Sequence, residues 1–258
     1  MKICRFITSD SQIPRFGALG EKTIEPFLSS DIFRNDFETG APTNLSDAKL
    51  LPPVMPSKIV CIGRNYAEHA RELGNEVPKE PLLFLKAPSS LITDQEPIVI
   101  PNQSVQVEHE GELAVVIGRL AKNIGADENP LDYVFGYSCL NDVTARDLQR
   151  KDVQFTRAKS FDTFCPINSF VETDFDGSNA EVQVRVNGLI KQKGNTNQMV
   201  FSVSDLIRYV SHQMTLLPGD LIATGTPSGV SKLNPGDTVE VEIEGIGVLS
   251  NPVRKSDD

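Results

Sequence analysis

Histidine, cysteine and long apolar runs are scarce in this sequence, and each scarcity excludes a class of protein. The chain has 3 histidines, at positions 69, 109 and 212, which argues against a histidine-rich zinc site. Its 4 cysteines are irregularly spaced and include no Cys-x-x-Cys pair, so a secreted disulfide scaffold is not indicated. No segment approaches the roughly 20 apolar residues of a membrane span, and charge interrupts the N-terminal residues before any signal-length apolar core. We therefore expect a soluble, cytoplasmic protein with reduced thiols.

Basic residues are also fewer than acidic ones. The chain carries 25 Lys and Arg against 35 Asp and Glu, a formal net charge of -10, and no Lys/Arg cluster interrupts this balance. A nucleic-acid backbone or an anionic membrane surface would be repelled, so we expect neither as a partner. With 258 residues, of which 39% are hydrophobic, the chain is long enough to bury a substantial core.

A proline-dense stretch divides the chain. Residues 51–56 read Leu-Pro-Pro-Val-Met-Pro, which cannot continue a strand ladder or a helix. We place a domain boundary there, with a small N-terminal domain at residues 1–55 and a larger domain at residues 56–258, which holds all the candidate site residues described below.

Strand-like segments joined by short turns dominate the second part, so the predicted fold class is mostly β with few helices. Asn187-Gly188 follows one such segment and is a strong hairpin signal. Pro-Gly-Asp turns at 218–220 and 235–237 each precede another strand-like segment, because Pro presets the turn and Gly supplies positive φ. Two helices are expected: one begins at a capping box in residues 202–205, and one spans residues 65–73, capped by Asn65 and closed by Gly74.

Carboxylates recur on alternate residues at Glu108, Glu110 and Glu112 and lead into an apolar stretch. Neighbours two apart on a strand share one face and lie about 6.6 Å apart, so Glu110 and Glu112 point into one space. A hard divalent cation such as Mg²⁺ would relieve their repulsion. The ordinary alternative is a solvated sheet face, which we expect for the later Glu240, Glu242 and Glu244.

A third oxygen ligand is available at Asp142, which follows a strand-like segment. Taken alone, this Asp is equally typical of a helix N-cap. Arg146 and Asp147, a few residues on, read as an ordinary surface pair of little energetic weight.

His69 and Glu72 lie three residues apart and therefore share a helix face, where the carboxylate can hold and polarise the imidazole. Such a pair could activate water, although an exposed charged helix is the simpler interpretation. His109 projects from the opposite strand face to Glu110 and is assigned to packing or the rim of the site. The Gly-rich loop at 224–229 could receive a carboxylate on its free N–H groups or be a simple turn. Lys159, in a mostly polar stretch, would by itself be assigned to the surface.

From Ile59 to Val253, the residues of these segments and their order along the chain resemble the motifs of the fumarylacetoacetate hydrolase family. The resemblance is carried by Gly63-Arg64-Asn65-Tyr66, by His109-Glu110-Gly111-Glu112-Leu113-Ala114-Val115-Val116, by Asn141-Asp142-Val143-Thr144-Ala145-Arg146-Asp147, by Ala158-Lys159-Ser160-Phe161-Asp162 and by Thr224-Gly225-Thr226-Pro227-Ser228-Gly229. It implies a mixed β-sandwich-like roll with a small N-terminal domain, a homodimer, and Mg²⁺ or Mn²⁺ held by Glu110, Glu112 and Asp142. The acidic Glu108 beside these ligands is a departure that could tilt the pocket charge against highly anionic substrates.

The resemblance also assigns roles and an activity. His69 and Glu72 match the catalytic lid dyad, Lys159 a third catalytic residue, and Arg64, Gln149 and Thr226 positions that bind a 2-oxo acid substrate. The main expectation is a Mg²⁺-dependent hydrolase that cleaves acylpyruvates through a metal-bound pyruvate enolate. The alternative is an isomerase, tautomerase or decarboxylase of dicarboxylic 2-oxo acids such as 2-hydroxyhepta-2,4-diene-1,7-dioate or oxaloacetate. A non-catalytic ligand-binding module is the third possibility.

Overall fold

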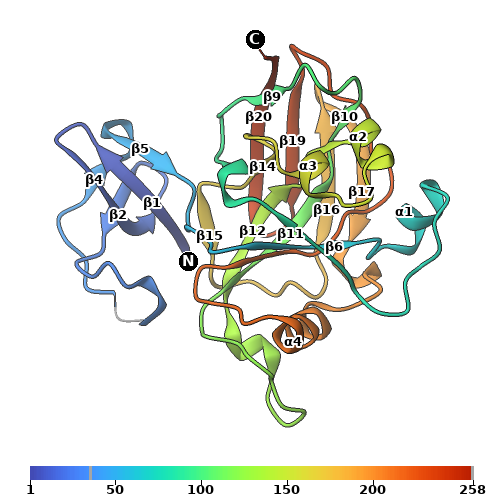
Figure 1. Cartoon of the computed structure of the whole chain (residues 1–258). Coiled ribbons are helices and arrows are strands. Elements are labelled where there is room, and N and C mark those ends of the chain that lie inside the picture. Colours follow the sequence, from blue (N-terminus) through green and yellow to red (C-terminus); the bar gives the residue numbers. More distant parts are fainter. Residues whose placement is uncertain (35–36, 257–258) are drawn as a thin grey trace.

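The computed structural model describes residues 1–34 and 37–256, and most of its ordered elements are strands (Figure 1). The largest sheet has 11 strands in the order β4-β3-β2-β1-β15-β12-β11-β18-β6-β7, with β5 paired to β1. Its strands are β1 (Lys2–Thr8), β2 (Ser11–Leu19), β3 (Thr23–Pro26), β4 (Thr43–Asn44), β5 (Ala48–Leu51), β6 (Ile59–Gly63), β7 (Leu82–Lys86), β11 (Gly111–Ile117), β12 (Val134–Asn141), β15 (Phe170–Glu172) and β18 (Leu221–Ala223). The predicted mostly β fold class is confirmed.

A second sheet of 5 strands, in the order β17-β16-β19-β20-β9, packs against the first. Its strands are β9 (Ile98–Ile100), β16 (Glu181–Val186), β17 (Leu189–Asn195), β19 (Thr238–Ile243) and β20 (Gly247–Lys255), and the smaller pairs are β10 (Val107–Glu108) with β13 (Thr144–Ala145) and β8 (Leu91–Ile92) with β14 (Cys165–Pro166).

The sheets come very close at Gly111. A Cβ there would lie 2.3 Å from Val184 Cγ2, so only glycine fits between Glu110 and Glu112. The core between the sheets is formed by alternate residues of the facing strands, such as Leu113 and Val115 from β11 and Val182 and Val184 from β16.

Helices are short apart from one. They are α1 (Ala67–Glu72), α2 (Arg146–Lys151), α3 (Thr156–Lys159) and α4 (Val203–Gln213), with 3₁₀ turns at Ile32–Arg34, Leu45–Asp47, Pro88–Ser90, Pro130–Tyr133 and Thr196–Gln198. The predicted capping box is confirmed. Ser202 Oγ accepts a hydrogen bond from Asp205 N–H, and the Asp205 carboxylate accepts one from Ser202 N–H. No helix in the described part of the chain is long and apolar enough to cross a membrane.

The helix at α1 differs from its prediction at one end. Tyr66, not Asn65, is its N-cap residue, and no side chain caps it. Asn65 is used elsewhere: its amide donates to Thr224 O at 2.8 Å and to Phe201 O at 3.1 Å, which ties the base of the helix to two distant segments. Gly74 has φ +70, as a glycine that follows a helix should.

The turn predictions are confirmed. Asn187 and Gly188 have φ values of 52 and 76 and join β16 to β17 with Val186 opposite Leu189. Both Pro-Gly-Asp turns lead directly into a strand, β18 or β19.

The N-terminal strands extend the large sheet, because β1 pairs with β15. In Figure 1 these strands (blue) lie to one side of the remaining elements. The division at residue 55 stays a prediction.

Candidate active site

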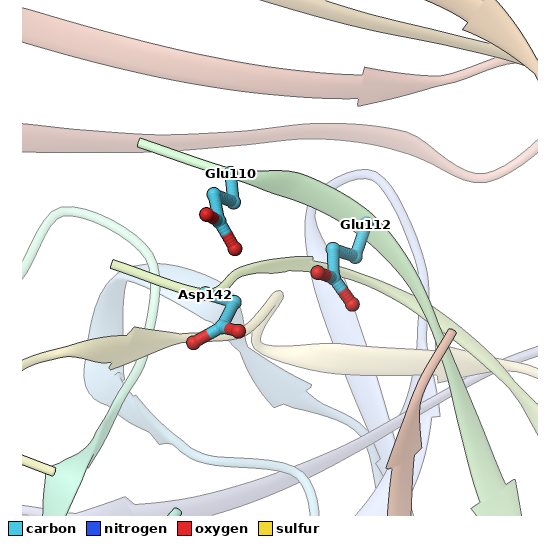
Figure 2. Close-up of side chains that lie close together, drawn as sticks. All are labelled: Glu110, Glu112 and Asp142. Atoms are coloured by element: carbon cyan, nitrogen blue, oxygen red, sulfur yellow. The ribbon is translucent and has the colours of Figure 1, made fainter. Parts of the chain in front are cut away.

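Three buried carboxylates converge where two neighbouring strands meet. Gly111 on β11 is opposite Asn141 at the end of β12, so Asp142 lies beside Glu110 and its N–H donates to Glu110 O at 2.8 Å. Glu110, Glu112 and Asp142 are 4%, 2% and 0% exposed, and each offers an oxygen within 4.8 Å of the other two. Figure 2 shows the three carboxylates turned toward a common space. The alternation in the sequence therefore does place two acids on one face.

Each carboxylate has one oxygen held by a partner outside this space. Arg146 Nη2 donates to Glu110 Oε1 at 2.6 Å, and Gly225 N–H donates to Glu112 Oε2 at 2.7 Å. The third partner is Lys86, whose Nζ donates to Asp142 Oδ1 at 2.7 Å and to Val143 O at 3.1 Å. These contacts fix the orientation of the acids.

Lys159 occupies the inner side of the cluster. Its Nζ donates to Glu110 Oε2 at 2.7 Å and to Asp142 Oδ2 at 2.6 Å, and the side chain is 2% exposed. The surface assignment that its own stretch suggested is wrong, and the position implied by the family resemblance is the one it takes. The reason is that α3 packs against β7 and β13, and Lys159 is on its buried side.

The electrostatics differ between the two glutamates. Burial opposes ionisation of Glu110, but Lys159 and Arg146 outweigh it and hold its pKa well below the usual range. Burial raises the pKa of Glu112 well above its usual value, and the charges of Asp142 and Glu110 raise it further. Glu112 is thus the acid that most lacks a positive neighbour.

The donor set fits a hard divalent cation. All three groups are carboxylates, and one oxygen of each is directed inward while the other is held outside, which is the arrangement of three monodentate oxygen ligands. Glu112, with its unfavourable buried charge, is the acid that such a cation would stabilise most.

The interpretation of Arg146 and Asp147 as a surface pair is wrong. Arg146 is 4% exposed and reaches Glu108 Oε2 at 2.8 Å as well as Glu110, while Asp147 accepts from Ser104 Oγ at 2.6 Å. The charge of Glu108 is therefore compensated by Arg146 rather than directed at the substrate.

The dyad forms on α1. His69 Nδ1 lies 3.3 Å from Glu72 Oε2, and His69 is 5% exposed, so α1 buries its histidine while its charged residues Glu68, Arg71 and Glu72 stay exposed. Glu72 also accepts from Gly229 N–H, with its two oxygens at 3.0 and 3.1 Å. His109 is confirmed as a packing residue, since it is fully buried between Gln192 and Ser231.

The loop at 224–229 binds carboxylates of the protein itself. Gly225 N–H bonds Glu112 and Gly229 N–H bonds Glu72, while Thr226 Oγ1 donates to Gly111 O at 2.8 Å. The loop is therefore not a simple turn, and it connects the acidic cluster with the dyad.

One cavity of about 300 Å³ brings most of the predicted site together. Glu110, Glu112, His69 and Lys159 line it, as do the three predicted substrate-binding residues Arg64, Gln149 and Thr226. The sequence prediction missed Lys86, Arg150, Phe84 and Phe155. Lys86 had a signal, a lysine that ends the apolar segment Leu82–Lys86, and such a charge requires a buried partner.

Comparisons with known proteins agree with this site. Residues 58–254 match the model of the family described as fumarylacetoacetate (FAA) hydrolase, C-terminal, and residues 1–53 match Rv2993c-like, N-terminal. The chain belongs to the fumarylacetoacetate hydrolase family. It is an enzyme of that family with a buried acidic triad suited to a divalent metal.

Some similar proteins are named for reactions of oxaloacetate, and others for isomerisation of a longer dioate. The chain is 50% identical to the mitochondrial oxaloacetate decarboxylase of Dictyostelium discoideum, over 73% of this chain and 89% of the relative. It is 45% identical to the mitochondrial oxaloacetate tautomerase fahd2 of Xenopus laevis, over 81% and 69%. The crystal structure of 2-hydroxyhepta-2,4-diene-1,7-dioate isomerase from Mycobacterium marinum superposes with a TM-score of 0.89 at 39% identity and covers 100% of both chains.

Proposed function

We propose that this protein is a divalent-cation-dependent tautomerase or isomerase of a dicarboxylic 2-oxo acid, of which oxaloacetate is the simplest. The observation that carries the proposal is one cavity lined both by Glu110 and Glu112 of the buried acidic triad and by two less buried arginines, Arg64 and Arg150. Relatives named for oxaloacetate and for a seven-carbon dioate support the same substrate class.

The lining of the cavity offers a partner for each end of such a substrate. A divalent cation held by Glu110, Glu112 and Asp142 would act as a Lewis acid for the 2-oxo-carboxylate end. Lys159, whose Nζ bonds Glu110 and Asp142 of the triad, would be the donor to the oxygen on which negative charge develops. Arg64 has no hydrogen bond or ion pair among residues 1–34 and 37–256, so its guanidinium is available to the distal carboxylate.

His69 is the group we assign to proton transfer. It takes a proton from C3 of the keto acid as the C2–C3 double bond forms, and it returns this proton to the 2-oxo oxygen, so the enol forms without loss of any atom. Glu72, 3.3 Å from His69 Nδ1, orients the ring and stabilises its protonated form. The reverse transfer gives the keto form.

Arg64 is also the reason for preferring tautomerisation to decarboxylation. Release of CO₂ from oxaloacetate converts the distal carboxylate into a neutral molecule, and an arginine that binds the carboxylate stabilises the reactant more than that transition state. Decarboxylation of oxaloacetate is therefore the reaction that competes with the proposed tautomerisation, and the assay below distinguishes the two.

Hydrolysis of acylpyruvates is a second candidate, favoured by the His69/Glu72 pair. A buried imidazole polarised by a carboxylate can activate water for attack on a 4-oxo carbon.

Purified protein tests these candidates when it is mixed with oxaloacetate or acetylpyruvate, with and without Mg²⁺. We expect Mg²⁺-dependent enol–keto interconversion, followed by ultraviolet absorbance, without a matching rise in pyruvate in the NMR spectrum. Pyruvate and CO₂ formed in step with enol loss would indicate a decarboxylase, and acetate with pyruvate from acetylpyruvate a hydrolase. Mg²⁺ alone gives the uncatalysed rate, and Glu244→Ala, which removes an exposed acid in the turn after β19, is the control protein.

We further propose that the protein is a homodimer in the cytoplasm. Light scattering on the eluting protein, with one monomer of 28.3 kDa as the reference, tests the assembly.

A further inference from the structure

One oxygen of each triad carboxylate faces the common space: Glu110 Oε2, Asp142 Oδ2 and Glu112 Oε1. The other oxygen of each is held outside by Arg146, by Lys86 or by Gly225 N–H, as described above. Two of the three inward oxygens, those of Glu110 and Asp142, already share one donor, the ammonium of Lys159. Two of the oxygens that suit a metal are thus already bound to the ammonium of Lys159.

We propose that Lys159 is an internal cation that competes with the divalent metal for these oxygens, and that metal binding displaces its ammonium into the substrate cavity. The proposal rests on the metal site proposed above. It gives Lys159 two successive positions: between Glu110 and Asp142, and beside the bound substrate.

The distances favour competition between the two cations. Mg²⁺ binds carboxylate oxygens at about 2.0 to 2.1 Å, and Lys159 Nζ lies 2.7 and 2.6 Å from oxygens of Glu110 and Asp142. Two cations in contact with the same pair of oxygens repel each other strongly at a site shielded from water. The divalent ion carries the larger charge and can also reach Glu112, which Lys159 does not bond.

The surroundings give the displaced ammonium somewhere to go. Lys159 lines the cavity of about 300 Å³, and its Nζ lies 4.9 Å from the centroid of the Phe84 ring, which lines the same cavity. An aromatic face stabilises an ammonium, and the four-carbon lysine stem is flexible. Lys86 differs, because it does not line the cavity and Val143 O holds its Nζ as well as Asp142.

A consequence is an order of binding. Lys159 becomes available to an anionic substrate once the metal has taken its place, so metal and substrate each strengthen the binding of the other by the same factor. While Glu110 and Asp142 hold its ammonium, Lys159 is not free to bind the carboxylate of a 2-oxo acid.

Lysine labelling of the wild-type protein tests the displacement directly. Reductive methylation with formaldehyde, read by peptide mass spectrometry, should modify Lys159 at least several-fold faster with saturating Mg²⁺ than without it. Lys86 should stay unmodified in both conditions, and the 61%-exposed Lys193 should react equally in both. Equal or slower labelling of Lys159 with Mg²⁺ would overturn the proposal.

A pair of matched variants gives a second measurement. Lys159→Met and Lys86→Met each remove one buried ammonium that bonds Asp142 at nearly the same distance. Titration calorimetry with Mn²⁺ should show about tenfold tighter binding for Lys159→Met, because the competitor is gone, and weaker binding for Lys86→Met, because Asp142 loses an outer partner.

The outcomes separate the two proposals. If wild-type protein binds no Mn²⁺, the metal site itself is wrong and this inference is wrong with it. If Mn²⁺ binds to wild-type protein and Lys159→Met binds it no more tightly, the site stands and only the competition is wrong. The labelling result remains decisive if Lys159→Met does not fold.

Discussion

The carboxylate of Glu72 accepts hydrogen bonds from the backbone N–H of Gly229, at 3.0 and 3.1 Å. The same carboxylate faces His69, and at the other end of the loop Gly225 N–H holds Glu112. One short loop therefore positions both the helix that carries the proposed base and the cluster that would hold the metal. Gly229 has φ +102, and a Cβ there would lie 2.1 Å from Lys191 O, so only glycine can present this N–H.

Glu72→Gln and Glu72→Ala separate two roles of this carboxylate. The glutamine keeps an oxygen for Gly229 N–H but loses the charge that stabilises protonated His69, whereas alanine loses both. We expect both variants to lower kcat by about 10² to 10³, and alanine alone to raise KM and to speed amide hydrogen exchange in residues 64–79. Equal exchange rates in the two variants would show that the Gly229 bond does not hold the helix.

Glu112→Ala should abolish Mg²⁺-dependent turnover while the fold survives. Burial and the neighbouring acids raise the pKa of Glu112, so its ionised form is unfavourable in the folded protein. Replacing Glu112 with alanine removes the repulsion between its carboxylate and those of Asp142 and Glu110. We expect a Tm no lower than that of the wild type without metal, and loss of the increase in Tm that Mg²⁺ gives the wild type. Unchanged turnover would disprove this ligand assignment.

Arg64→Gln tests the substrate class. A charged hydrogen bond to the distal carboxylate contributes about 1.5 to 3 kcal/mol, so kcat/KM for oxaloacetate should fall by roughly 10 to 100-fold. Turnover of a 2-oxo acid with one carboxylate, such as acetylpyruvate, is the internal control and should change little. A uniform loss on both substrates would mean that Arg64 acts on the shared 2-oxo-carboxylate end.

Asp220 stabilises the strand pair that supports the loop. It is fully buried, bonds Ser57 N–H at 2.8 Å and Leu217 N–H at 2.8 Å, and forms an ion pair with Lys58, which aligns β18 beside β6. Burial opposes its ionisation, but the bonds from Leu217, Lys58 and Ser57 lower its pKa.

Because the folded pKa of Asp220 lies below the unfolded value, its ionisation stabilises the fold above the unfolded pKa of about 3.9, and this stabilisation is lost as the pH falls through the folded pKa. Asp220→Asn should cost about 2 to 4 kcal/mol at pH 7. The difference in unfolding free energy from the wild type, measured in urea, should shrink below about pH 4. A difference that does not vary with pH would show that the charge is not what matters.

Local patterns in the sequence were enough for several features. The period of two put Glu110 and Glu112 on one strand face, turn residues fixed the hairpin at Asn187-Gly188, and the capping box fixed the start of α4. These features depend on neighbours a few residues away, whose geometry the backbone imposes. The homodimer, the roles of individual site residues and the boundary at residue 55 stay predictions.

Asn65 and Arg146 show what local patterns miss. The type and spacing of each residue fitted a helix cap or a surface pair, yet Asn65 joins Phe201 to Thr224 and Arg146 reaches Glu110, 36 positions earlier. A polar group is satisfied by whichever partner lies nearest when the chain is folded, and sequence distance does not measure that.

The sequence by itself determined that the chain is mostly β, that Glu110 and Glu112 are spaced to point into one space, and that the motifs follow one family's order, which adds Asp142 to these acids. Only the tertiary structure decided what surrounds those acids: Lys86 and Lys159, from β7 and α3, each bond one oxygen of Asp142. The physical reason is that a buried charge must be compensated in space, and the compensating residues come from strands and helices that only the packing of the whole chain brings together.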